Sequence, residues 1–123
     1  MADILYIVVP CYNEEEVLPE TSRRLRAKLE GLMAAGRISE QSRVLFVNDG
    51  SRDKTWNIIE MLHGECPLFS GIDLSRNRGH QNALLAGLMI SADRCDMAIS
   101  MDADLQDDID AVDAMVEQYY AGC

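Results

Sequence analysis

Two aspartates one residue apart follow the last short apolar run of the chain. Asp102 and Asp104 come directly after residues 97–101, and Gln106 adds a third side-chain oxygen at the same alternating spacing. A short apolar segment bounded by polar residues is typical of a buried strand. Two carboxylates this close repel each other unless a cation lies between them, and hard divalent cations prefer oxygen ligands. Because Asp is also common in turns and helix caps, the motif alone predicts either a cation site or a turn.

The overall composition limits the classes of protein that remain. The chain has 123 residues, enough for one domain or part of a larger one, and 48% of them are hydrophobic. Eleven basic against 21 acidic residues give a formal charge of −10, which argues against binding to nucleic-acid phosphates. We find neither an apolar stretch of bilayer length nor a secretory leader, and therefore expect a cytoplasmic location.

Cysteine chemistry is not expected to contribute to function. The four cysteines lie far apart and form no Cys-x-x-Cys pair, which excludes the usual zinc and thioredoxin patterns. Most of the four, which are Cys11, Cys66, Cys95 and Cys123, are expected to be small buried hydrophobic residues.

Apolar runs alternate with helical patterns along the chain. Strands are expected at residues 4–9, 44–47, 68–74 and 97–101. Helices are indicated by apolar residues at three- and four-residue spacing, over residues 17–32, 56–62, 83–90 and 109–120. This alternation predicts an α/β fold with a mostly parallel sheet flanked by helices.

Polar clusters follow all four expected strands. They occupy residues 12–14, 48–51, 75–79 and 102–106. In a parallel sheet the carboxyl ends of the strands lie along one edge, where open α/β sheets bind their ligands. The sequence therefore predicts that four polar clusters meet at one crevice.

Several side chains of these clusters have two readings. Asp49 can accept a hydrogen bond from a sugar hydroxyl or a base nitrogen, while residues 48–53 also suit a turn and helix cap. Tyr12 can stack on a base or hold its own loop. Glu14 can contact the ligand or favour the start of the first helix through its dipole. Pro10 fixes the backbone as the chain leaves the first strand.

The loop after the third strand is basic. Arg76 and Arg78 can clamp an anionic group or form surface ion pairs near Asp73. His80 follows at the expected start of a helix, where a capping or packing role is expected rather than proton transfer.

Two other nucleotide-binding classes do not fit. A dinucleotide oxidoreductase needs a glycine-rich turn after the first strand. Here residues 10–15 read PCYNEE, with no glycine and with carboxylates near the phosphate position. A Walker phosphate loop is also absent from the sequence.

Three ordered motifs resemble those of family 2 glycosyltransferases, in particular the branch that transfers sugars to dolichol or undecaprenyl phosphate. They are residues 9–15 (VPCYNEE), 47–51 (VNDGS) and 102–106 (DADLQ). The resemblance covers approximately residues 4–106. It departs from the family pattern after the aspartates, where residues 107–110 (DDID) replace the prolines that are frequent there.

The resemblance implies a Rossmann-like, GT-A type nucleotide-sugar-binding fold. The cofactor-binding residues would be Pro10, Tyr12, Glu14, Asp49 and Asp102. The metal, Mg²⁺ or Mn²⁺, would be held by Asp102 and Asp104 of the DXD motif and by Gln106. The reaction implied is an inverting transfer of a sugar from a nucleoside-diphosphate sugar to a lipid-phosphate or glycan acceptor. Of these acceptors, we expect polyprenyl phosphate. Such an acceptor is already an anion, so no catalytic base is assigned.

The resemblance also implies that residues 1–123 are the nucleotide-sugar-binding part of a longer catalytic domain. Its acceptor part and any membrane-associated segments would then lie beyond Cys123, at the cytoplasmic face of a membrane, and this part alone would be inactive. A truncated sheet edge predicts homodimerisation or poor solubility, because unpaired strand edges can pair with other strands. The alternative from a different class is a non-catalytic nucleotide-binding or protein-interaction module.

Overall fold

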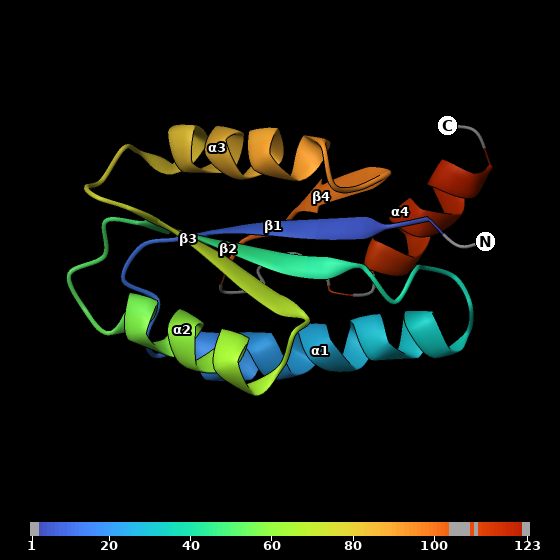
Figure 1. Ribbon diagram of the computed structural model, residues 1–123, viewed down its shortest axis with the longest axis horizontal. Helices are drawn as coiled ribbons and strands as arrows, with labels where there is room; N and C mark the ends of the chain where they lie inside the picture. Colours follow the sequence, from blue (N-terminus) through green and yellow to red (C-terminus); the bar gives the residue numbers. More distant parts are fainter. Residues whose placement is uncertain (1–2, 104–108, 110, 122–123) are drawn as a thin grey trace.

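The computed structural model describes residues 3–103, 109 and 111–121 (Figure 1). The described residues form four strands, β1 (Leu5–Cys11), β2 (Arg43–Asp49), β3 (Phe69–Leu74) and β4 (Met97–Ser100). They also form four helices, α1 (Leu18–Ala34), α2 (Thr55–Glu65), α3 (His80–Ala92) and α4 (Ala111–Tyr120). The predicted alternation of strands and helices is confirmed.

The strands form one parallel sheet in the order β3-β2-β1-β4. In the register of this sheet, Val8 of β1 lies between Leu45 of β2 and Ser100 of β4. From β1 the chain runs through α1 to β2 on one side, whereas β4 lies on the other side of β1. The strand order therefore reverses at β1, and open α/β sheets bind ligands beside such a reversal.

Both faces of the sheet are covered. Figure 1 shows α1 and α2 below the sheet and α3 above it. Side chains of a strand alternate between the two faces, and in β1 Ile7 packs in the α1–α2 core whereas Val8 packs in the α3 core. All but one of the β1 side chains are fully or almost fully buried. This two-sided burial explains why the first strand reads as a continuous apolar run.

Strand β1 is longer than predicted because it continues through Pro10 to Cys11. Proline has no N–H to donate, so it is normally excluded from a central strand. Here the ladder to β4 ends at Val8, whose carbonyl accepts a hydrogen bond from the N–H of Met101 at 3.0 Å. Because neighbouring residues of a parallel strand bond to opposite sides, Pro10 faces the β4 side two residues beyond the last pair. The missing donor therefore costs no ladder hydrogen bond.

Small residues let α3 lie close to the sheet. Ala83 and Gly87 are both buried on the helix side that faces β1 and β2. A Cβ atom on Gly87 would lie 2.4 Å from Cγ1 of Val8 and 2.9 Å from Cγ2 of Val47. No real side chain fits at these distances, so the position of α3 depends on this glycine.

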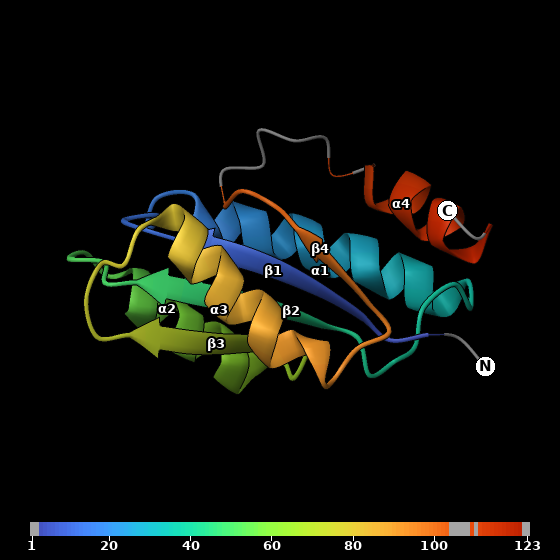
Figure 2. The ribbon, with the colours of Figure 1, turned by 90° about the horizontal axis from the view of Figure 1, so that it is seen from above.

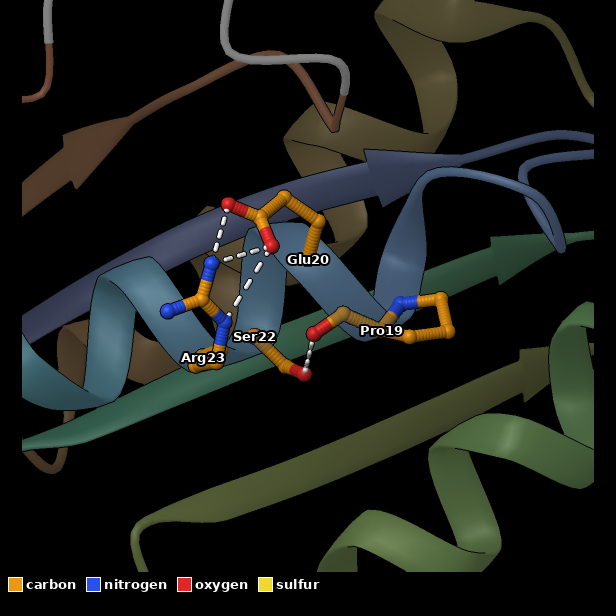
Figure 3. A network of polar contacts seen from close by, with 4 residues as sticks. All are labelled: Pro19, Glu20, Ser22 and Arg23. Carbon is orange, nitrogen blue, oxygen red and sulfur yellow. Dashed lines mark hydrogen bonds and ion pairs between the residues drawn. The ribbon is translucent and has the colours of Figure 1, made fainter.

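The first turns of α1 carry a local polar network (Figure 3). The hydroxyl of Ser22 donates to the carbonyl of Pro19 at 2.9 Å, and Arg23 forms an ion pair with Glu20. The hydrogen bond from Arg23 lowers the pKa of the Glu20 carboxyl. Because both charged side chains are exposed, the pair contributes little to stability. The pair offsets the charge of Arg23, one of four basic residues between positions 23 and 28 of α1.

Helix α4 lies beside α1, as two views of the chain show (Figures 1 and 2). Val112 and Val116 are buried, and Lys28 of α1 forms an ion pair with Asp113 at 2.7 Å. The helix begins later than predicted, because Ile109 is buried in a turn that precedes it. Within the described residues, no helix combines the length and apolar character needed to span a bilayer.

The close approach of α3 gives a stability prediction. Gly87→Ala should lower the free energy of unfolding by about 1–3 kcal/mol, because overpacking outweighs the better helix propensity of alanine. Gly31→Ala in α1 is the matched control, since its Cβ would meet nothing within 4 Å. Urea denaturation should therefore show that G31A is as stable as the parent chain or more stable. Equal stability of the two variants would contradict the packing account.

Candidate functional site

A cavity of about 290 Å³ lies at the carboxyl ends of the strands. Its walls come from the ends of β1 and β2, from the segment after β4 and from the region where α3 begins. The described residues that line it are Pro10, Cys11, Tyr12, Glu14, Asp49, Asn77, His80, Asp102 and Ala103. The crevice predicted from the four polar clusters is therefore present, beside the strand-order reversal.

All five residues predicted to hold the nucleotide line this one cavity. They are Pro10, Tyr12, Glu14, Asp49 and Asp102. Asp104 and Gln106, predicted as metal ligands with Asp102, lie outside the described residues. Among the residues that the structure does describe, no group of three or more His, Cys, Asp or Glu side chains could hold a metal ion.

A second hollow of similar volume lies between α1 and α2. Apolar side chains such as Ile58, Met61 and Phe69 line much of it, and none of the predicted site residues that the structure describes does so. The cavity at the strand ends is the better candidate because it collects polar groups from separate loops.

The loop after β3 reaches the cavity, as its polar cluster predicts. Asn77 and His80 line the cavity, whereas Arg76 and Arg78 are exposed and are not among its described lining residues. Of the two readings of these arginines, the lining of this cavity therefore does not support the anion clamp. The sequence marks the polar cluster but not which of its side chains turn inward, because that depends on the path of an irregular loop.

Asp49 holds this loop in place. Its side chain is buried, with 3% of its surface exposed, and Oδ1 accepts a hydrogen bond from the N–H of Arg78 at 2.6 Å. The neighbouring Asn48 amide donates to Asp73 of β3 at 2.8 Å. A carboxylate has two acceptor oxygens, so Asp49 can bind the loop and still accept from a ligand.

Gly50 brings the two loops into direct backbone contact. Its φ is +68°, a conformation that glycine adopts readily. A Cβ atom there would lie 2.3 Å from the backbone nitrogen of Asn77 and 2.5 Å from the carbonyl carbon of Arg76. The wall formed by the loop of residues 75–79 can therefore take this position only with glycine at residue 50.

The loop after β1 rests on the loop after β2. The N–H of Glu14 donates to the Thr55 hydroxyl at 2.8 Å, and the N–H of Glu15 donates to Asp53 Oδ2 at 3.3 Å. Asp53 Oδ1 also accepts from the N–H of Thr55, the first residue of α2. Asp53 thus accepts from the first residue of α2, although the N-cap residue itself is Lys54, and Asp53 also braces the neighbouring loop.

The pKa values of two side chains near the cavity are shifted. Burial alone would raise the pKa of the Asp53 carboxyl, but hydrogen bonds from the Thr55 hydroxyl and from the N–H groups of Thr55 and Glu15 outweigh it and lower the pKa. Burial, reinforced by the charge of Glu14, raises the pKa of the Cys11 thiol far above its ordinary value. Cys11 therefore stays protonated and lines the cavity as a small apolar group, as predicted.

Asp102 is positioned by bonds on both sides of it. The N–H of Met101 donates to the carbonyl of Val8 at 3.0 Å, and the Thr21 hydroxyl of α1 donates to the carbonyl of Ala103. These bonds fix the chain as it leaves β4 and bring the half-buried Asp102 side chain to the cavity. Carboxylate oxygens are suitable ligands for a hard divalent cation.

Comparison with known proteins gives a consistent family match. The model for glycosyl transferase family 2 matches residues 6–123. An uncharacterized glycosyltransferase, YkoT of Bacillus subtilis, is 48% identical over 120 residues, which are 98% of this chain and 36% of that protein. A prophage bactoprenol glucosyl transferase homolog of Escherichia coli is 37% identical over 116 residues, or 94% of this chain and 35% of the relative.

An undecaprenyl-phosphate 4-deoxy-4-formamido-L-arabinose transferase of Shewanella sediminis is 37% identical over 121 residues, which are 98% of this chain and 34% of the relative. Among solved structures, residues 1–349 of Staphylococcus aureus TarS in complex with UDP match with a TM-score of 0.63 and 18% identity. That match covers 95% of this chain and 33% of TarS 1–349, and it supports the GT-A type fold. The chain spans about a third of the length of these relatives.

The contact at Gly50 gives a prediction about the cavity wall. Gly50→Ala should displace the loop of residues 75–79 and speed hydrogen exchange at the Arg78 amide at least about tenfold, the factor for a weakening of about 1.4 kcal/mol. Gly36→Ala is the matched control, because Gly36 also has a positive φ of +73° but a Cβ there would meet nothing within 4 Å. G36A should carry the conformational strain of about 1–2 kcal/mol without affecting Arg78 exchange. Equal Arg78 exchange in G50A and G36A would contradict the role of this contact.

The lowered pKa of Asp53 gives a pH-dependent prediction. A carboxyl with a lowered folded-state pKa stabilises the fold above its ordinary value of 3.8, and this contribution is lost as the pH falls through the folded pKa. Asp53→Asn should therefore be less stable than the parent at neutral pH, with a difference that shrinks once the pH falls below about 4. Urea denaturation across this pH range measures the difference in unfolding free energy between D53N and the parent. A difference that stays constant with pH would exclude the predicted contribution of the Asp53 carboxylate.

Proposed function

Because the chain belongs to glycosyl transferase family 2, we propose that it binds the nucleoside-diphosphate sugar donor of a metal-dependent glycosyltransferase. The observation that carries the proposal is the cavity at the strand ends. Residues that are far apart in sequence, Tyr12, Asp49 and Asp102, line it together. The sequence match identifies the family, and this arrangement supports a specific location for the donor.

The nucleoside is proposed to bind between Tyr12 and Asp49. Tyr12 is 42% exposed, so its ring is accessible for stacking on a base, an interaction worth about 1–3 kcal/mol. The Asp49 carboxylate is an acceptor, and it favours a base edge or ribose that presents an N–H or O–H group. Uracil, thymine and guanine carry a ring N–H that suits this acceptor, which supports UDP-, dTDP- or GDP-sugars as donors.

The diphosphate requires a counter-charge at this cavity. Glu14, Asp49 and Asp102 supply three carboxyl groups to its lining, and these would repel a pyrophosphate. Mg²⁺ or Mn²⁺ held by Asp102, together with Asp104 and Gln106, is proposed to offset this repulsion. When bound, such a metal stabilises the negative charge that develops on the departing nucleoside diphosphate. Asn77 and His80 line the cavity as well and offer hydrogen-bond donors to the phosphates.

The acceptor is proposed to be a polyprenyl phosphate, with inversion at the sugar carbon. Support comes from relatives that are named for bactoprenol and undecaprenyl phosphate. A phosphate acceptor is already nucleophilic as an anion, so none of the lining residues is assigned as a general base. Residues 1–123 are proposed as the donor-binding part of an enzyme that acts in cell-wall or polysaccharide synthesis at the cytoplasmic face of a membrane.

Calorimetric titration with UDP, dTDP and GDP, each with and without Mn²⁺, tests this proposal. We expect at least one nucleotide to bind in a metal-dependent manner. Asp102→Asn and Asp104→Asn should each weaken the metal-dependent binding by at least about tenfold while the fold is retained. Asp93→Asn, an exposed position at the end of α3, is the control for loss of a carboxylate and should bind normally.

Two results would contradict the proposal. If none of the three nucleotides binds in a metal-dependent manner, the donor site is excluded and a protein-interaction module is favoured. Unfolding of D104N would show that Asp104 is a structural cap, and the metal assignment would then be wrong.

A further inference from the structure

Asn13 has an unusual backbone conformation beside the cavity. Its φ is +53°, and it is the only non-glycine residue with a positive φ in the described part of the chain. Asparagine adopts this left-handed region more easily than most residues, but the conformation still requires support from its surroundings. Asn13 lies between two residues of the cavity lining, Tyr12 and Glu14.

Two hydrogen bonds connect Asn13 to the loop after β2. Its N–H donates to the Ser51 hydroxyl at 2.9 Å, and its side-chain Oδ1 accepts from the N–H of Arg52 at 2.9 Å. One bond uses the backbone of Asn13 and the other uses its side chain, so both parts of the residue are held in place. These two hydrogen bonds fix the loop after β1 against the loop after β2 at Asn13, where the backbone is left-handed.

Asn13, Ser51 and Arg52 are themselves absent from the described cavity lining. Their effect on the cavity must therefore pass through the neighbouring residues. Tyr12 is 42% exposed, which means that packing alone holds its ring weakly and that its direction depends on the backbone at Asn13. The N–H of Glu14 donates to Thr55 in the same neighbouring segment, so both sides of Asn13 are anchored there.

We propose that Asn13 and Ser51 are positioning residues for the nucleoside, a role that rests on the proposed function of the cavity. They hold the left-handed turn that keeps Tyr12 and Glu14 at the cavity before the ligand arrives. Binding is then not opposed by the cost of ordering this loop. Neither residue contacts the ligand, so substitutions act on nucleoside affinity and not on the metal.

The decisive experiment compares nucleoside and nucleotide binding in four variants of the chain. Asn13→Ala removes the side-chain acceptor and disfavours the left-handed turn, and Ser51→Ala removes the acceptor for the Asn13 N–H. Each should weaken the binding of both uridine and UDP about five- to tenfold, the range expected for loss of one hydrogen bond that orders the loop. Ser51→Thr keeps a hydroxyl and should restore affinity.

Ser39→Ala is the matched control. The Ser39 hydroxyl also accepts a hydrogen bond from a backbone N–H, that of Gln41 at 3.0 Å, but in the connection before β2 at the opposite end of the sheet. S39A removes the same kind of bond and should leave uridine and UDP affinity unchanged. Urea denaturation of all variants separates loss of affinity from loss of global stability. The Mn²⁺ concentration needed for half-maximal UDP binding should be the same in N13A and S51A as in the parent.

The outcomes separate this proposal from the proposed function. If the parent chain binds uridine and UDP, and N13A and S51A bind both as tightly as S39A does, the positioning role is wrong and the donor site stands. A loss confined to UDP, or a changed Mn²⁺ requirement, would also overturn it, because the residues would then act at the phosphate or metal. If the parent chain binds neither uridine nor UDP, the same comparison is made with thymidine and dTDP and with guanosine and GDP. If it binds none of these nucleosides and nucleotides, the donor site falls, and the positioning role falls with it.

Discussion

Hydrogen bonds from backbone N–H groups of one loop to side chains of the next hold the candidate site together. The parallel sheet brings the loops to one edge, but irregular loops at a sheet edge have many alternative paths. Asp49 accepts from Arg78, Thr55 accepts from Glu14 and Ser51 accepts from Asn13. These bonds link the loop after β1 to the loop after β2. They also link the end of β2 to the loop after β3. Such bonds also satisfy backbone donors that would otherwise need water.

This arrangement gives the acidic and polar residues of the loops two different tasks. Asp53, Ser51 and Thr55 support neighbouring backbone, whereas Tyr12 and Asp102 line the cavity. Residues of both kinds lie in or beside the same short sequence motifs. A family motif can therefore preserve the shape of a site as well as its direct contacts with a ligand. Packing beneath the loops adds to this order, since Gly87 lets α3 approach the sheet and brings its beginning to the cavity.

Much of this could be predicted from sequence, because the strongest signals are local. Continuous apolar runs such as β2 indicate strands buried on both faces, and four expected strands interleaved with helices imply a parallel sheet. The topology then predicts that Tyr12, Asp49 and Asp102 come together, and they do. Other features depend on tertiary contacts. Pro10 fits inside β1 only because the β4 ladder has already ended, and the close approach of the loop of residues 75–79 depends on glycine at residue 50. The left-handed turn at Asn13 has no distinct sequence signal, since asparagine is common in many loop conformations.

The central claim is that one cavity at the carboxyl ends of the strands holds both the nucleoside and the metal-bound diphosphate. A crystal structure of the chain with Mn²⁺ and the nucleoside diphosphate that it binds would locate both groups. We expect the base beside Tyr12 and Asp49, with the metal between Asp102 and the diphosphate. A nucleotide bound in the hollow between α1 and α2, or a metal away from Asp102, would contradict it.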